Sequence, residues 1–127
     1  MTSKTKIELE FPMKCSPSVL YNRLSTASGL TEWFADDVNV KGKLFSFIWD
    51  GSTQVAEMIQ SKDSRLVRFK WEDDDDEDTY FEFLINKDEM TGDVSLLITD
   101  FADEGEEEET TDLWNSQIAD LRQVLGC

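Results

Sequence analysis

Residues 113–125, LWNSQIADLRQVL, decide the fold class of this chain. Their large apolar side chains recur at spacings of four, three and four, so they form one stripe along a helix. The stripe consists of Trp114, Ile118, Leu121 and Leu125, and Leu113 and Val124 widen it. The sequence predicts no second long helix to cover this stripe, so it must bury against a β-sheet. The segment therefore predicts a long C-terminal helix that lies across a sheet.

Alternation of apolar and polar residues predicts the strands of that sheet. In the first of them, Ile7, Leu9 and Phe11 share one face and charged residues occupy the other. The predicted strands cover residues 6–11, 37–41, 43–50, 54–60, 65–71, 79–86 and 93–101. Because the connections between the later strands are short, neighbouring strands should pair antiparallel as a meander.

Two short helices are predicted between the first and second strands. Ser16 followed by Pro17 is typical of a helix start, with a hydroxyl cap and a proline at the first helical position. We expect Gly29 to end this helix and residues 30–34 to form the second one. The fold class is therefore α+β, with a seven-stranded curved antiparallel sheet around a long C-terminal helix.

Length and charge restrict the function. The 127 residues are the size of one domain, so a single domain over residues 1–127 is predicted. A net charge of -16 argues against a nucleic-acid partner. There is no apolar run long enough to insert into a membrane. The polar start lacks the apolar core of a signal peptide, and Cys15 and Cys127 do not suggest a disulfide framework, which together predict a cytoplasmic location.

Most of the excess charge belongs to two segments, Glu72 to Asp78 and Asp103 to Glu109, which hold seven and six acids. Alternate connections of a meander lie at the same end of the sheet, so both runs should gather at one acidic pole. Mutual repulsion should raise several carboxylate pKa values there. The runs are consistent with solvated loops, with a docking site for a basic protein or with loosely held divalent cations.

The sequence lacks the residue types and motifs that are typical of catalytic sites. It contains no histidine, its two cysteines lack the spacing of a zinc site, and it has neither a phosphate-binding loop nor a nucleophile elbow. No catalytic residue, metal site or cofactor is predicted, and a non-enzymatic role is favoured.

Inward-facing aromatic residues are the candidates for ligand binding. They either fill the core completely or line a pocket for a flat or aliphatic ligand. The candidate lining residues are Trp33, Phe47, Trp49, Phe69, Trp71, Phe83, Trp114 and Ile118. The parity of the connections places Asp36, Asp50, Asp74 and Glu106 at the acidic pole, and we expect them to form an acidic rim if the mouth of the pocket lies at that end of the sheet.

Four motifs occur in the order seen in a known family. They are Leu30-x-x-Trp33-Phe34, Gly42-x-x-Phe45-x-Phe47, Leu66-Val67-x-Phe69-x-Trp71 and the closing helix with Trp114. Together they resemble the Bet v 1/START-like (SRPBCC) superfamily, and most closely its branch related to the activator of the Hsp90 ATPase.

The resemblance implies a helix-grip fold over almost the whole chain, with the mouth of the pocket at the end of the sheet that carries the acidic pole. Function is less constrained, since the superfamily includes lipid binders, cyclases, dehydratases and chaperone regulators. The expected function is non-enzymatic binding of a small apolar ligand between the sheet and the last helix. The alternative is a chaperone-regulator module that docks a basic protein through the acidic pole.

Overall fold

The computed structural model describes residues 4–74, 76 and 78–126. The elements follow in the order β1 (Lys4–Met13), α1 (Pro17–Ser25), α2 (Ala27–Thr31), β2 (Asp37–Lys41), β3 (Leu44–Trp49), β4 (Ser52–Lys62), β5 (Leu66–Trp71), β6 (Phe81–Lys87), β7 (Val94–Asp103) and α3 (Glu107–Leu125). This order confirms the predicted fold class, a strand and two short helices followed by six strands and a long helix.

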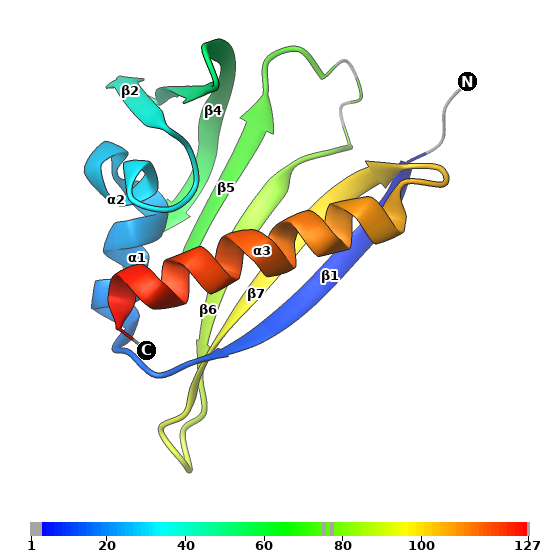
Figure 1. The fold of residues 1–127 in the computed structure, drawn as a ribbon. Coiled ribbons are helices and arrows are strands. Elements are labelled where there is room, and N and C mark those ends of the chain that lie inside the picture. Colours follow the sequence, from blue (N-terminus) through cyan, green and yellow to red (C-terminus); the bar gives the residue numbers. More distant parts are fainter. Residues whose placement is uncertain (1–3, 75, 77, 127) are drawn as a thin grey trace.

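The strands form one antiparallel sheet in the order β1-β7-β6-β5-β4-β3-β2. From β2 to β7 each strand pairs with the next strand in sequence, and β1 pairs with β7 at one edge of the sheet. The sheet curves, and α3 lies across its concave face (Figure 1). The arrangement confirms the helix-grip fold.

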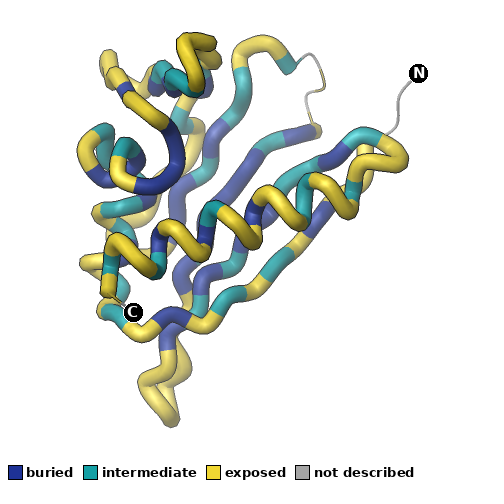
Figure 2. Tube along the Cα trace, viewed as in Figure 1, coloured by how far each residue is buried: buried dark blue, intermediate teal, exposed yellow. Residues whose placement is uncertain are grey.

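One stripe of α3 faces the sheet. Trp114, Ile118 and Leu121 are buried there, whereas Leu113 is 58% exposed. Figure 2 shows the alternation of buried and exposed residues along this helix. The expectation that Leu113 and Val124 widen the buried stripe is therefore wrong, because both side chains are exposed at the edge of the helix.

The two short helices begin at hydroxyl caps. The Ser16 hydroxyl accepts a hydrogen bond from the Val19 N–H, as predicted, and Pro17 opens α1. The second helix differs from the prediction, since it starts after Thr26, whose hydroxyl accepts from the Gly29 N–H, and ends at Thr31. Gly29 therefore does not break α1. It lies inside α2, where an added Cβ would be 2.3 Å from the Asn22 carbonyl oxygen of α1.

Aromatic rings fill most of the space between the sheet and the helices. The side chains of Phe47, Phe69, Phe81 and Phe83 are at most 1% exposed. Their ring centroids lie 5.0 Å apart for Phe69 and Phe81 and 5.9 Å apart for Phe81 and Phe83. The deep part of the space between the sheet and α3 is thus solid core.

Candidate functional site

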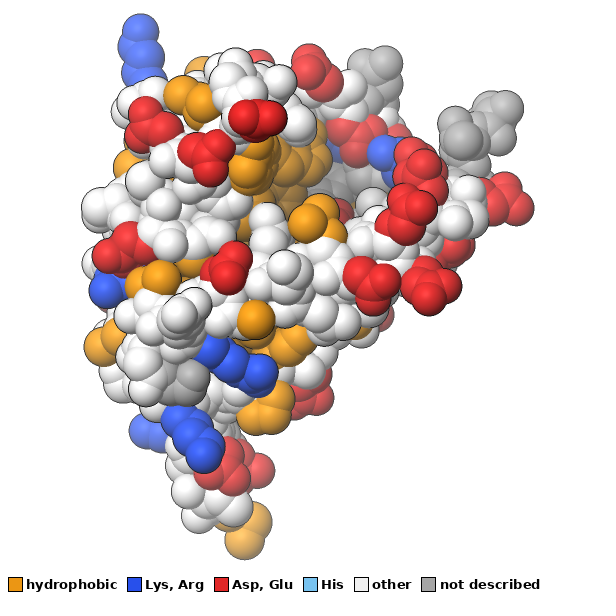
Figure 3. Space-filling view, in the orientation of Figure 1, with side chains coloured by type: hydrophobic (Ala, Val, Ile, Leu, Met, Phe, Trp, Pro, Cys, Tyr) orange, Lys and Arg blue, Asp and Glu red, His pale blue; other side chains and the backbone are white. Residues whose placement is uncertain are grey.

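A groove of about 430 Å³ opens beside the first half of α3. We call it the aromatic groove, and its lining consists of Phe34, Trp49, Gln54, Trp71, Asp100, Leu113, Trp114 and Gln117. The rings come from the segment after α2, from the ends of β3 and β5, and from α3. In Figure 3 an apolar hollow is visible above α3, with acidic side chains on both sides of it.

The rings of the groove are inclined to one another. The centroids of Trp49 and Trp71 are 6.1 Å apart with an interplanar angle of 56°. Phe34 lies edge-on to Trp49 at 5.3 Å and stacks on Trp114 at 5.9 Å. Trp49 and Trp71 are only half-buried, so part of their surface faces the groove.

Hydrogen bonds fix two of these indoles. The Nε1–H of Trp49 donates to the Phe34 carbonyl oxygen at 2.7 Å. The Nε1–H of Trp114 donates to Oδ2 of Asp100 at 2.9 Å. Both indole N–H groups are therefore satisfied inside the protein and are not offered to a ligand.

Asp100 is the acid in the wall of the groove. Its Oδ1 accepts a hydrogen bond from the Phe101 N–H at 2.8 Å, in addition to the bond from Trp114. Burial raises the pKa of Asp100, and the two hydrogen bonds and the nearby Lys4 ammonium offset only part of this effect. A carboxylate is thus held in the wall of the groove beside four aromatic rings.

The structure separates the predicted lining residues into two groups. Trp49, Trp71 and Trp114 line the aromatic groove. The other five candidates belong to the packed core, at 6% exposure or less: Trp33, Phe47, Phe69, Phe83 and Ile118. On β3 and β5 the two groups share one face of the sheet, with Phe47 and Phe69 in the core and Trp49 and Trp71 at the ends of the strands.

Five lining residues were not predicted: Phe34, Gln54, Asp100, Leu113 and Gln117. One signal for Asp100 was present in the sequence. Val94, Leu96 and Ile98 alternate on the concave face of β7, and continuing their period of two by one step reaches Asp100. The acid therefore occupies an inward position that the pattern assigns to an apolar residue.

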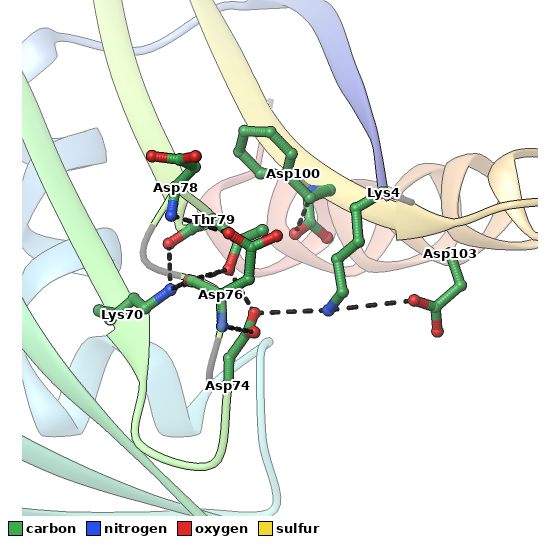
Figure 4. Close-up of polar contacts among 9 residues, drawn as sticks. Lys4, Lys70, Asp74, Asp76, Asp78, Thr79, Asp100 and Asp103 are labelled. Atoms are coloured by element: carbon green, nitrogen blue, oxygen red, sulfur yellow. Dashed lines mark hydrogen bonds and ion pairs between the residues drawn. The ribbon is translucent and has the colours of Figure 1, made fainter. Parts of the chain in front are cut away.

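Two lysines organise the loop between β5 and β6 at the acidic pole (Figure 4). The Lys4 ammonium pairs with Asp74 at 3.4 Å and reaches Asp103 at 4.0 Å. The Lys70 ammonium donates to the carbonyl oxygen and hydroxyl of Thr79 at 2.7 and 2.8 Å, and also to the carbonyl oxygen of Asp76. The loop is thus fixed to β1 and β5 despite its charge.

The expectation of raised pKa values in the acidic runs is wrong for two described acids. Burial would raise the pKa of Asp74, but hydrogen bonds from the Thr79 hydroxyl and the Asp76 N–H, with help from Lys4 and Lys70, lower it. Backbone N–H groups and the Thr5 hydroxyl lower the pKa of Glu107. Local donors outweigh the mutual repulsion. Asp75 and Glu77 lie outside the described residues.

The predicted rim acids lie outside the lining of the groove. Asp36 and Asp50 are adjacent, since Oδ2 of Asp36 accepts from the Asp50 N–H at 2.7 Å. Asp74 belongs to the β5–β6 loop, and Glu106 is the exposed residue that precedes α3. Within the described ranges, no group of three or more acidic or cysteine side chains is arranged to hold a metal ion. None of the described helices is long and apolar enough to cross a membrane.

Comparison with known proteins finds a family whose pattern matches the whole chain. The sequence pattern of the family described as "START-like superfamily domain" matches residues 1–127. A protein from Bacteroides fragilis, solved by NMR, is 35% identical, with a TM-score of 0.70 over 98% of this chain and 93% of the other.

Two further solved structures share the fold at lower identity. The Aha1 dimer from Colwellia psychrerythraea is 19% identical, with a TM-score of 0.71 over 95% of this chain and 92% of that chain. A Mesorhizobium loti protein is 15% identical, with a TM-score of 0.78 over 96% and 97% of the two chains. Among curated proteins, none matches this sequence.

Proposed function

This chain belongs to the START-like superfamily, and we propose that it binds a small apolar ligand in the aromatic groove without changing it chemically. The observation that carries the proposal is the groove itself. Its volume of about 430 Å³ falls in the range of small-molecule sites, and four large rings contribute to its lining. The side chains of Gln54 and Gln117 are polar groups at its wall that could orient a ligand.

The lining favours binding over catalysis. Among the described residues of the groove, Asp100 is the one side chain that titrates near neutral or acidic pH. Its carboxylate is already engaged by Trp114 and the Phe101 N–H. Proton transfer to and from a substrate usually needs a pair of groups with different roles, and the groove supplies one.

Tryptophan fluorescence tests this function, because Trp49, Trp71 and Trp114 all border the groove. Titration with 1-dodecanol, a neutral apolar probe, should give a saturable change in emission. The substitution Gln117→Phe places a ring in the groove and should abolish that change. Asn115→Phe is the matched control, since it adds the same ring at an exposed position of α3. Absence of saturable binding, or equal binding by both variants, would refute the proposal.

The acidic pole supports a second candidate, the docking of a basic protein. Many of its described acids are exposed: Glu72, Asp73, Asp76, Asp78, Glu104, Glu106, Glu108 and Glu109. The Lys70 ammonium donates to carbonyl and hydroxyl oxygens there and, among the described residues, forms no ion pair with these carboxylates. The resemblance to the Hsp90 activator branch and the likeness to the Aha1 dimer agree with this candidate.

A decalysine peptide is a suitable probe for the pole. Its binding should weaken steeply with salt and should be reduced by the double substitution Asp73→Asn and Asp76→Asn. The control neutralises two exposed acids of the β6–β7 hairpin, Glu89→Gln and Asp93→Asn, at the other end of the sheet (Figure 1). An equal loss in both variants would show a response to net charge alone.

A further inference from the structure

The aromatic groove carries a negative charge that the protein does not neutralise by direct contact. Among the described residues no Lys or Arg forms an ion pair with Asp100. Lys4 is close enough to lower the pKa of Asp100, but its ammonium group is placed against Asp74 at 3.4 Å and Asp103 at 4.0 Å. The Trp114 and Phe101 N–H groups are dipoles and leave the net charge in place.

The indole rings add to this negative potential. The face of an aromatic ring is electron-rich and its edge is electron-poor. The N–H edges of Trp49 and Trp114 are used by the Phe34 carbonyl oxygen and by Asp100. A ligand therefore meets ring surface and the Asp100 carboxylate beside the side chains of Gln54, Leu113 and Gln117, and the N–H donors of these two indoles are turned away from it.

Two inclined indoles of the groove suit a compact cation. Trp49 and Trp71 are half-buried, and their centroids lie 6.1 Å apart with an interplanar angle of 56°. A cation is attracted to a ring within about 6 Å of its centroid, and tryptophan is the strongest partner. Inclined neighbouring rings allow one cation to contact more than one face.

On these grounds we propose that the aromatic groove selects a small organic ammonium ion, with a methylated head group, over neutral and anionic molecules of the same shape. The inference rests on the proposed function, since it names the ligand class for the same groove. The rings supply contact with the methyl groups and Asp100 supplies the opposite charge. The chain's net charge of -16 favours the approach of cations and repels carboxylate ligands.

Choline and 3,3-dimethyl-1-butanol form a matched pair for the test, because the alcohol replaces the charged nitrogen by carbon at nearly the same shape. Each is titrated into the full chain and followed by tryptophan fluorescence and by NMR shifts of the indole N–H signals. We expect choline to bind at least about tenfold more tightly than the alcohol, because a cation–π contact beside a carboxylate contributes a free energy of that order.

The variants assign the preference to Asp100. Asp100→Asn keeps an acceptor for the Trp114 N–H and should reduce choline affinity about tenfold, with no change for the alcohol. Glu106→Gln is the matched control, because it removes one charge from an exposed residue outside the lining. If Asp100→Asn does not fold, Trp71→Leu removes a ring face, keeps an apolar side chain and should also reduce the preference for choline.

The outcomes separate this inference from the function beneath it. Equal affinity for choline and the alcohol would overturn the cation preference and leave the binding function intact. Equal loss of choline affinity in Asp100→Asn and Glu106→Gln would also overturn it, since the effect would come from net charge. Binding of neither compound, with no response to 1-dodecanol, would overturn both. Tighter binding of decalysine than of choline at the indole signals would assign the groove to a protein partner and refute the small-molecule ligand.

Discussion

The hydrogen bond between Trp114 and Asp100 should contribute measurably to the stability of the fold. The substitution Trp114→Phe keeps an aromatic ring against Phe34 and Phe83, whose centroids lie 5.9 and 5.7 Å from the indole. It removes the Nε1–H that donates to Oδ2 of Asp100 at 2.9 Å. A hydrogen bond to a charged group contributes about 1.5 to 3 kcal/mol, so we expect a loss of that order.

Truncation of the same residue should be more severe. Trp114 is 4% exposed, so Trp114→Ala removes nearly all of a buried ring and also leaves Asp100 without its donor. Large-to-small changes of this kind cost about 3 to 5 kcal/mol. A domain of this size has a free energy of unfolding of about 5 to 15 kcal/mol, so the variant should fold but be markedly less stable.

A double-mutant cycle isolates the bond itself. In the Asp100→Asn background the acceptor is neutral, and Trp114→Phe should cost only about 0.5 to 1.5 kcal/mol. The control is Trp33→Phe, because the Trp33 indole is 6% exposed and donates to a backbone carbonyl oxygen, that of Arg23, at 2.8 Å. Its cost should be the same in both backgrounds.

Urea denaturation followed by far-ultraviolet circular dichroism is the appropriate assay, since it does not depend on the tryptophans. The reasoning would be refuted by additive effects of Trp114→Phe and Asp100→Asn, with a coupling energy below about 0.5 kcal/mol. Equal coupling of Asp100→Asn with Trp33→Phe would refute it as well.

Three further predictions concern pH, the acidic loop and the contact between the short helices. Burial raises the pKa of Asp100 above 3.8, so the folded protein holds this proton more tightly than the unfolded chain does. The group therefore stabilises the fold at low pH, and that contribution is lost as pH rises through the raised pKa. In urea denaturation, the free energy of unfolding of Asp100→Asn relative to the wild type should therefore be higher at pH 7 than at pH 4. A difference that does not change with pH would contradict this. Lys70→Met should speed amide hydrogen exchange in the β5–β6 loop, whereas the exposed Lys41→Met should not. Gly29→Ala should lower stability by about 1 to 3 kcal/mol, because the new Cβ would lie 2.3 Å from the Asn22 carbonyl oxygen; an unchanged melting temperature would show that α1 and α2 can separate.

Periodicity was sufficient to predict the strands and the long helix, but it did not predict how deeply each inward side chain is buried. Phe47 and Trp49 alternate identically on β3, yet Phe47 has no exposed surface and Trp49 borders the groove. The same holds for Phe69 and Trp71 on β5. Whether an inward ring is core or lining depends on where α3 and the segment after α2 cover the sheet, and a period of two contains no information about that.

The errors at α2 and at the acidic pole have local causes. A five-residue helix is too short for its bounds to be read from periodicity, and its start is set by a single bond from the Gly29 N–H to the Thr26 hydroxyl. At the pole, counting charges predicted repulsion. Local donors, among them the Thr79 hydroxyl, instead lower the pKa of Asp74. Local hydrogen bonds therefore decided the start of α2 and the direction of the pKa shift at the pole.

The wall of the aromatic groove contains one departure from the apolar pattern of β7. Ile98 precedes it on the concave face with 1% exposure, and Ile118 and Leu121 of α3 are fully buried, so this end of the sheet–helix contact is closed. At position 100 the chain places a carboxylate instead, and Trp114 turns its N–H toward it. Burying a charge without a base in contact is costly, and an apolar residue at this position would give a simpler and more stable contact. Acids with raised pKa values in clefts are concentrated at functional sites, and the position of Asp100 agrees with the ligand proposed for this groove.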